Sequence, residues 1–357
     1  MTASKKKFSP WVSLVVLATL LVGPACNLSL FEPAPAVEET VAPDGTEPAL
    51  RAFFSTPGTR ERPEGIDELI RAIDGAQESV LVAMYNFTLD EAGEALLDAY
   101  ERGILVQVVL ETDALDGEWA RRMQSEGIEM ASDGREGLMH YKFVVIDERE
   151  VWTGSWNLTT GGTYYDNNNL VRVRSQAAAE NYVAEFREMF DEDKFGPDGS
   201  NPTPNPLVML GGTRMEFYFS PEDAPAERVV DLLYGAKESV EMMAYSFTLD
   251  DVGEALKSGA ARGLDVRVVC DAEQVNGTGA ECPLLQRDGL DVRVDSLEGL
   301  MHHKVIVIDS EIVIFGSFNF TRSANIRNDE NLVVVYDAEL ARAFQAEFEQ
   351  IYKSAVD

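Results

Sequence analysis

The sequence is poor in the residues that build metal sites, and this limits its chemistry. Its 357 residues include only three cysteines and three histidines. A structural zinc site takes four ligands, usually cysteine and histidine, and neither the spacing nor the count of these residues supplies them. We therefore expect no metal site and no cofactor.

Positive charge is also scarce. Thirty Lys and Arg residues stand against 62 Asp and Glu, which gives a formal net charge of −32. A chain this acidic repels a polyanion unless its positive charge is concentrated locally. A broad basic groove for duplex DNA is therefore disfavoured.

Long apolar runs are absent beyond the N-terminus. Hydrophobic residues make up 45% of the chain and charged residues 26%, which is typical of a folded globular protein. No stretch of the body approaches the ~20 apolar residues that a membrane-spanning helix needs. We expect a soluble body, and the length favours two domains.

The first 26 residues are typical of an export signal. Three lysines at positions 5–7 precede an apolar run over 11–22, which is too short to span a membrane. The segment ends in Gly-Pro-Ala-Cys, which resembles a bacterial lipoprotein processing site, although Gly23 stands where Leu is usual. We expect export to the cell envelope with lipidation of Cys26 and membrane anchoring; simple secretion is the alternative.

The other two cysteines are Cys270 and Cys282. In an oxidising compartment they could form a disulfide that closes one loop. They could equally remain two unpaired thiols, with Cys270 at the buried end of a strand.

The chain is a tandem repeat with two linkers. Residues 27–48, rich in Pro, Ala and Glu, are expected to form a disordered tether. Residues 196–212, which contain four prolines, separate two similar halves, 49–195 and 213–357. The halves share the blocks YNFTLDEAGEAL and YSFTLDDVGEAL, and EGLMHYKFVVID and EGLMHHKVIVID.

Each half alternates strands with helices, which predicts an α/β domain with helices covering a central sheet. Two such halves would pack about a pseudo-twofold axis, as a monomer with an internal pseudo-dimer. Matching loops would then face each other, so that both halves could contribute to one composite site. Two independent sites are the alternative.

All three histidines fall in the most repeated blocks. Each half carries H-x-K-x4-D followed by G-S-x-N, and the motif residues are His140, Lys142, Asp147, Ser155 and Asn157, then His302, Lys304, Asp309, Ser317 and Asn319. Residues two apart on a strand point to one face, so each motif histidine should lie beside its lysine. His303 points the other way and is expected to pack or lie at the rim.

Two histidines, two lysines and two asparagines suit attack on a phosphodiester. One neutral imidazole can attack phosphorus while the other, protonated, supplies a proton to the departing alkoxide. Lys142 and Lys304 would neutralise the phosphoryl charge. The four Ser and Asn side chains of the G-S-x-N motifs would donate hydrogen bonds to the phosphate.

In both halves, from roughly residue 50 to the end, these motifs resemble those of the phospholipase D superfamily. The second half, with AYSFT, MHHKVIVID, GSFNFT and NDENLVVV, is similar to the small nuclease and mitochondrial cardiolipin hydrolase branch. The resemblance implies two phospholipase D-like α/β/α sandwich domains, a phosphohistidine intermediate, no required metal and one active site at the interface.

The same resemblance assigns Glu330 the role of orienting the histidine of its own half, His302, whereas the first half has Asn168 at the aligned position. We expect an asymmetric site, with His140 as nucleophile and His302 as general acid and base. Asp147 and Asp309 are counted with the catalytic set, with a turn-forming role as the alternative. Tyr85 and Tyr245 are expected to be core residues.

Three functions remain open. A phospholipid hydrolase is favoured, because a lipid anchor would hold the site beside phospholipid and the net charge disfavours nucleic acid. An endonuclease acting on single-stranded DNA or RNA by the same mechanism is the alternative. A phosphate-binding module without catalysis is the third, and it is disfavoured because both motif sets are intact.

Overall fold

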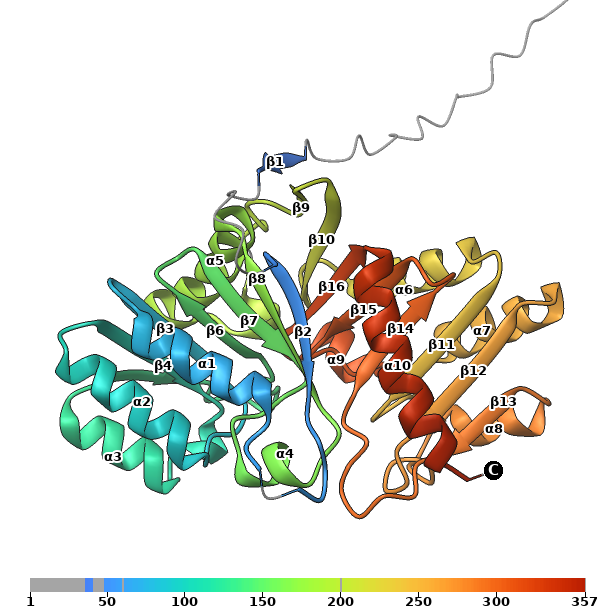
Figure 1. The fold of residues 1–357 in the computed structure, drawn as a ribbon, viewed down its shortest axis with the longest axis horizontal. Coiled ribbons are helices and arrows are strands. Elements are labelled where there is room, and N and C mark those ends of the chain that lie inside the picture. The colour runs from blue at the N-terminus through green and yellow to red at the C-terminus, as the bar shows by residue number, and fades with distance from the viewer. Residues whose placement is uncertain (1–35, 41–47, 60, 200, 357) are drawn as a thin grey trace, which may run out of the picture. The chain divides into compact units, whose positions relative to one another are not determined.

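The computed structural model describes residues 36–40, 48–59, 61–199 and 201–356. The predictions of a signal peptide and of lipidation at Cys26 fall outside these residues. The described residues form two sheets, one for each half of the chain (Figure 1).

The first half contains a seven-stranded sheet in the order β2-β8-β7-β6-β3-β4-β5. Its strands are β2 (Leu50–Phe54), β3 (Ser79–Met84), β4 (Leu105–Leu110), β5 (Glu129–Ser132), β6 (Lys142–Ile146), β7 (Glu150–Gly154) and β8 (Asn169–Arg174). Its helices are α1 (Glu64–Gly75), α2 (Asp90–Glu101), α3 (Glu118–Glu126), α4 (Thr160–Tyr164) and α5 (Gln176–Glu192), with a short 3-10 turn, η1 (Thr112–Ala114).

The second half builds most of a nine-stranded sheet in the order β1-β9-β10-β16-β15-β14-β11-β12-β13, to which segments outside that half add β1 and β9. Its strands are β1 (Val37–Glu39), β9 (Leu207–Leu210), β10 (Thr213–Ser220), β11 (Ser239–Ala244), β12 (Asp265–Cys270), β13 (Asp291–Val294), β14 (Lys304–Ile308), β15 (Ile312–Gly316) and β16 (Glu330–Tyr336). Its helices are α6 (Pro225–Gly235), α7 (Asp250–Arg262), α8 (Cys282–Arg287), α9 (Arg322–Ile326) and α10 (Ala338–Ser354), and the 3-10 turn η2 (Gly196–Asp198) lies in the linker.

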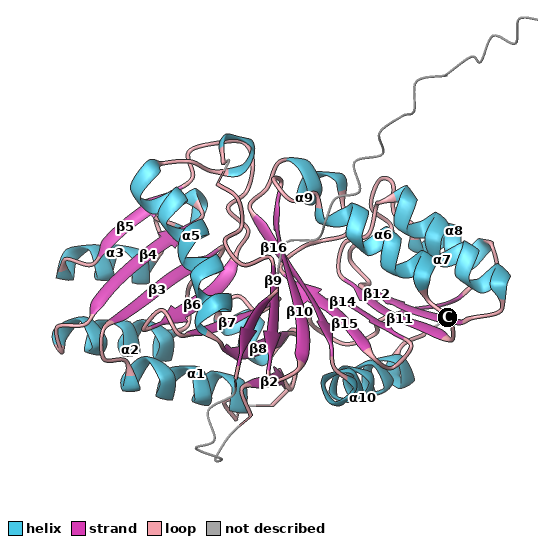
Figure 2. Cartoon of the chain, turned by 90° about the horizontal axis from the view of Figure 1, so that it is seen from above, coloured by secondary structure: helices cyan, strands magenta, loops and turns pink. Residues whose placement is uncertain are grey.

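The two halves share one core. The largest cluster of buried apolar residues takes side chains from both sheets and from the two long helices α5 and α10. Two further clusters lie on the outer faces, one under α1, α2 and α3 and one under α6, α7 and α8. The predicted pair of α/β sandwich domains is therefore confirmed, and the two domains lie side by side, joined by the core that includes α5 and α10 (Figures 1 and 2).

Local sequence explains where the long helices begin. The side chain of Ser175 accepts a hydrogen bond from the backbone N–H of Ala178 and caps α5, and Asp337 does the same for α10 through Glu339 and Leu340. Such caps satisfy N–H groups that have no partner within the helix. These caps therefore let each helix begin directly after the last strand of its half.

Two predicted linkers contribute strands, and the prediction that residues 27–48 are disordered is wrong for Val37–Glu39. These residues form β1, which pairs in parallel with β9, and β9 itself lies inside the predicted linker 196–212. The Glu39 carboxylate also accepts hydrogen bonds from Ser175 Oγ and the backbone N–H of Ala177, 2.9 Å away. The N-terminal segment thus joins the sheet of the second half while contacting α5 of the first.

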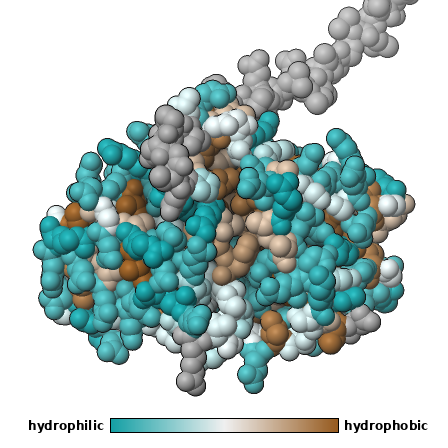
Figure 3. Space-filling model, viewed as in Figure 1, coloured by the Kyte–Doolittle hydropathy of each residue, from teal (hydrophilic) through white to brown (hydrophobic). Residues whose placement is uncertain are grey.

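Cys270 and Cys282 form a disulfide, which decides between the two alternatives left open by the sequence. The bond ties the end of β12 to the start of α8. Within the described part of the chain, no helix is both long and apolar enough to cross a membrane. On the face seen in Figure 3, hydrophilic residues cover most of both halves and hydrophobic ones gather where the halves meet.

Candidate active site

The two H-x-K motifs meet at the interface between the halves. Each lysine begins a buried strand, Lys142 in β6 and Lys304 in β14, and each histidine lies two residues earlier. Both histidine segments pair with the opposite half, Met139 with Asp329 and Met301 with Asn167. Both histidines and both lysines therefore belong to one composite site.

His140 is held by a carboxylate from the second half. Its Nδ1 lies 2.7 Å from Glu330 Oε2, and both side chains are buried. Burial, and then Lys142 and Lys304, lower the pKa of His140 well below its ordinary value, and burial raises the pKa of Glu330 to about 8. The 2.7 Å contact holds one proton between His140 Nδ1 and Glu330 Oε2, which leaves the Nε2 lone pair of the neutral ring free.

The assignment of Glu330 to His302 is therefore wrong. Glu330 begins β16, and the segment before that strand crosses the interface to pair with Leu138 and His140 through the backbone of Asp329. The carboxylate consequently faces the histidine of the other half.

His302 is held without a carboxylate. Its Nδ1 lies 3.0 Å from the backbone oxygen of Ser155 and 2.9 Å from Asn168 Oδ1, and that oxygen also accepts from Ser155 Oγ. Both oxygens only accept, so the ring proton is on Nδ1 and Nε2 is free. Burial, the two lysines and His140 lower the pKa of His302 well below its ordinary value. The expected asymmetry is present, with the partners of the two histidines exchanged between halves.

The two lysines are buried beside the histidines. Lys142 Nζ donates to the backbone oxygen of His140 and Lys304 Nζ to that of His302, each at 2.7 Å. Burial lowers the pKa of Lys142 to about 7 and that of Lys304 well below its ordinary value. Buried ammonium groups with so few partners are poised to gain from a bound anion.

Tyr85 and Tyr245 line the site rather than the core. The centroid of each tyrosine ring lies 4.7 Å from the ring centroid of the motif histidine in the same half. Lys142 Nζ stands 5.0 Å from the Tyr85 ring centroid and Lys304 Nζ 4.6 Å from that of Tyr245. The prediction that both tyrosines are core residues is therefore wrong. Their position at the start of a repeated block was the signal that could have identified them.

The serines of the G-S-x-N motifs hold the residues behind the histidines. Ser155 Oγ donates to Asn168 Oδ1 and accepts from the N–H of Asn169, while Ser317 Oγ bonds Glu330 and accepts from the N–H of Asn331. These hydroxyls are therefore hydrogen-bonded to protein groups. The prediction that they donate hydrogen bonds to the phosphate is not supported by this arrangement.

Asn157 and Asn319 are differently placed. Among the described residues neither side chain has a hydrogen-bond partner, and both Oδ1 atoms are buried. The glycines before them serve strand packing: a Cβ at Gly154 or Gly316 would lie 2.4 or 2.1 Å from a backbone oxygen of the next strand. Of the G-S-x-N residues, only the asparagines remain available to a ligand.

Asp147 and Asp309 are structural residues, and their assignment to the catalytic set is corrected. The Asp147 carboxylate accepts from the backbone N–H groups of residues 77–79 at 2.7 to 3.1 Å. Asp309 does the same for residues 237–239. Each aspartate follows a five-residue strand, and the motif histidine of the same half precedes that strand. About 16 Å of strand therefore separates each aspartate from its histidine.

Two acidic residues that the sequence reading passed over brace the histidine segments. Glu111 accepts from the N–H of Met139 at 2.7 Å, and Asp271 accepts from that of Met301 at 2.9 Å. Each directly follows a buried strand, β4 or β12, which is the signal that could have identified it. His303 is fully buried, between Asn169 and Glu347, so it packs and does not lie at a rim.

Further carboxylates stand near the tyrosines. Asp113 contributes to raising the pKa of Tyr85, and Glu273 and Asp166 do so for Tyr245, in each case after the larger effect of burial. Asp113 and Glu273 are exposed, and Asp166 is half-buried. The surroundings of the two buried lysines are therefore acidic.

Comparison with known proteins agrees with this geometry. A family model described as cardiolipin synthase, PLD-like domain, matches residues 69–190 and 229–352. Phospholipase D from Rickettsia bellii is 35% identical over 138 residues, covering 39% of this chain and 69% of that protein. Mitochondrial cardiolipin hydrolase from Chlamydomonas reinhardtii is 30% identical over 161 residues, covering 45% and 72%.

Solved structures that match most of the chain include a synthase. Phosphatidylserine synthase from Haemophilus influenzae aligns with 84% of this chain and 85% of its own, with a TM-score of 0.63 and 14% identity. At this identity the likeness concerns the fold. It extends over both halves, in agreement with the paired sheets.

Proposed function

Because the chain belongs to the phospholipase D-like family through its two PLD-like domains, we propose that it hydrolyses phosphodiester bonds at the one site shared by its halves, through a phosphohistidine. The observation that carries the proposal is the convergence of two buried His–Lys pairs, each histidine fixed through Nδ1 by a residue of the opposite half.

In the first step His140 Nε2 attacks phosphorus, a P–N bond forms and the P–O bond to the leaving alcohol breaks. The ring becomes cationic as this bond forms, and the Glu330 carboxylate, 2.7 Å from Nδ1, offsets that charge. The sequence had assigned Glu330 to His302, the expected general acid, whereas in the structure it contacts His140. The carboxylate now supports the same assignment of His140 as nucleophile.

His302 donates its Nε2 proton to the departing alkoxide and later takes one from the attacking water, which breaks the P–N bond and restores His140. The phosphodiester anion favours the protonated form of His302 when it binds. Lys142 and Lys304 neutralise the non-bridging oxygens, and the amides of Asn157 and Asn319 donate to them.

A phospholipid is the favoured substrate. A single phosphodiester needs only the two buried lysines, whereas a nucleic acid strand would bring further phosphates to a site whose surroundings include the carboxylates of Asp113, Asp166 and Glu273. The net charge of −32 acts in the same direction.

The test is a parallel assay of the purified mature protein. Phosphatidyl substrates, cardiolipin, single-stranded DNA and RNA are supplied with and without EDTA, and His140→Ala serves as the control for contaminating activity. We expect release of the head-group alcohol or phosphatidate from lipid, undiminished by EDTA. Cleavage of nucleic acid alone would replace the substrate assignment, and activity lost in EDTA and restored by a divalent cation would refute the metal-free mechanism.

We also propose that the chain is exported and anchored through Cys26. The support is the lysines at 5–7, the apolar run and the Cys26 processing pattern, together with the Cys270–Cys282 disulfide, which suits an oxidising compartment. Metabolic labelling with a fatty acid tests it: wild type should be labelled and Cys26→Ala should not. An unlabelled wild type would leave secretion as the mode of export.

A further inference from the structure

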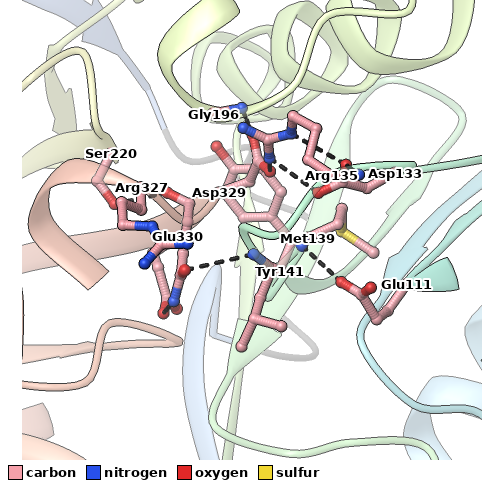
Figure 4. Close-up of polar contacts among 12 residues, drawn as sticks. Glu111, Asp133, Arg135, Met139, Tyr141, Gly196, Ser220, Arg327, Asp329 and Glu330 are labelled. Atoms are coloured by element: carbon pink, nitrogen blue, oxygen red, sulfur yellow. Dashed lines mark hydrogen bonds and ion pairs between the residues drawn. The ribbon is translucent and has the colours of Figure 1, made fainter. Parts of the chain in front are cut away.

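A buried ionic network lies behind His140 and joins the two halves. Arg135, in the loop before His140, donates through Nε and Nη2 to both carboxylate oxygens of Asp133, at 3.0 and 2.8 Å. Its Nη2 also donates to Asp329 Oδ2 at 2.8 Å, across the interface. Asp133 is fully buried and Asp329 nearly so, and both carboxylates lie beside the Arg135 guanidinium (Figure 4).

Asp329 connects this network to the orienting carboxylate. It directly precedes Glu330, its backbone oxygen accepts from the N–H of His140 at 3.0 Å, and its N–H donates to Leu138 at 2.9 Å. The backbone N–H of Gly196, in the linker, donates to its second carboxylate oxygen. The side chain of Asp329 is thus held from two sides, by Arg135 and by Gly196 (Figure 4). The next residue, Glu330, contacts His140.

The network places one guanidinium among several buried carboxylates. Asp329 and Glu330 are adjacent buried carboxylates, and Asp133 adds a third. Burial, and then Asp133, raise the pKa of Asp329, and the guanidinium of Arg135 opposes that rise. The guanidinium of Arg135 supplies a cation to Asp133 and Asp329, which leaves Glu330 to His140 and the lysines.

The pseudo-symmetric position lacks the network. There, Asp295, Leu297 and Asn167 stand in place of Asp133, Arg135 and Asp329, and the backbone pairing survives, with the N–H of His302 donating to Asn167 at 2.9 Å. Within the described residues, Asp295 Oδ2 and Asn167 Nδ2 are buried without a partner. Backbone pairing therefore does not require the arginine, and the network occurs only where a carboxylate faces the histidine.

We propose that Arg135 is a positioning residue for the nucleophile: by pairing with Asp329 it fixes Glu330 against Nδ1 of His140. The expected kinetic effect rests on the proposed function, whereas the positioning of Glu330 by Arg135 does not. Arg135 makes no contact with the reacting atoms in this account, so its loss should lower kcat and leave KM almost unchanged. A misplaced catalytic group can cost about a hundredfold in rate, and we expect a fall of about tenfold to a hundredfold.

The test uses Arg135→Leu, which copies the residue of the other half, and Leu297→Ala as the matched control. Because the chain has three histidines, histidine-selective 15N labelling gives three sets of ring-nitrogen NMR signals, which single His substitutions assign. We expect Arg135→Leu to shift or broaden the Nδ1–H signal of His140 while leaving His302 and His303 in place. Leu297→Ala should move none of the three.

The kinetic readout is kcat and KM on the substrate that the parallel assay identifies. A His140 signal unchanged in Arg135→Leu overturns the proposal whatever the rate, and so does a kcat equal to that of Leu297→Ala. If Arg135→Leu does not fold, Arg135→Lys, which retains one charge, should give a smaller shift in the same signal. A wild type without hydrolytic activity would refute the proposed function, while the NMR comparison would still decide the role of Arg135.

Discussion

At the scale of single residues, the two halves of the site differ most in what lies behind each histidine. His140 has the Glu330 carboxylate at 2.7 Å, and His302 has the Asn168 amide oxygen at 2.9 Å. A carboxylate stabilises a ring that becomes positively charged, and an amide fixes orientation and tautomer without adding charge. The two imidazoles are therefore suited to different steps of one reaction.

Lys142 should make the protein less stable as the pH falls from about 10 toward about 7. Burial lowers its pKa to about 7 in the folded state, against about 10.4 in an unfolded chain. Between these values only the unfolded state binds the proton, so this contribution to stability is complete above the unfolded pKa and lost as the pH falls to the folded one. The slope is at most about 1.4 kcal/mol per pH unit.

Lys142→Met removes this titration, and we expect it to remove activity as well, because the lysine is proposed to neutralise the phosphate. Its free energy of unfolding, measured by urea denaturation at several pH values, should therefore rise relative to wild type as the pH drops through that window, and the difference should level off below it. A difference that does not vary with pH would contradict the burial of an ionisable Lys142.

At the scale of elements, the Asp that closes each motif holds strands together. Asp147 joins the turn after β6 to residues 77–79 at the start of β3. Asp147→Ala should lower the free energy of unfolding by about 2 kcal/mol, because it leaves backbone donors without their acceptor. The kcat of the folded protein should be unchanged.

Glu148→Ala is the matched control for that substitution. Asp147 and Glu148 both have a positive φ, 51° and 53°, so alanine meets the same backbone cost at either position. The structural account fails if Asp147→Ala abolishes turnover in protein that is fully folded.

The disulfide is a second device at this scale. It closes a loop over a sequence separation of 12, and a loop of that size is worth about 3 kcal/mol. The double variant Cys270→Ala, Cys282→Ala should melt at a lower temperature than wild type. A reducing agent should lower the Tm of wild type alone, and an equal response in both would argue that the bond does not form in solution.

Sequence pattern predicted the elements that carry repeated motifs and failed for those that do not. Strands β6, β7, β14 and β15 follow directly from H-x-K-x4-D and G-S-x-N. Strands β1 and β9 lie in segments whose proline content is typical of linkers, and they form only because an open edge of the second sheet accepts them. Their strand character depends on a tertiary partner that the local sequence does not contain.

At the scale of the whole molecule, the exchange of partners across the interface makes the two halves one enzyme. The orienting residue of each histidine, Glu330 or Asn168, comes from the opposite half. Sequence could place Glu330 in the site but assigned it to the wrong histidine, because both halves offer the same strand pattern. Only the packing of the sheets decides which histidine faces that carboxylate.

A shared site predicts that neither half works alone. His140→Ala and His302→Ala should each abolish turnover, since one removes the proposed nucleophile and the other the proposed proton donor. Two independent sites would leave about half of the activity in each single variant. Circular dichroism of both variants serves as the control for folding.

The most direct test is to trap the phosphoenzyme. The protein is mixed with a phosphodiester substrate and quenched before the second step, the phosphate bound per chain is counted, and the modified residue is located by mass spectrometry. The account predicts at most one phosphate per chain, on His140. Phosphate on His302, two phosphates per chain, or none on either histidine would contradict it.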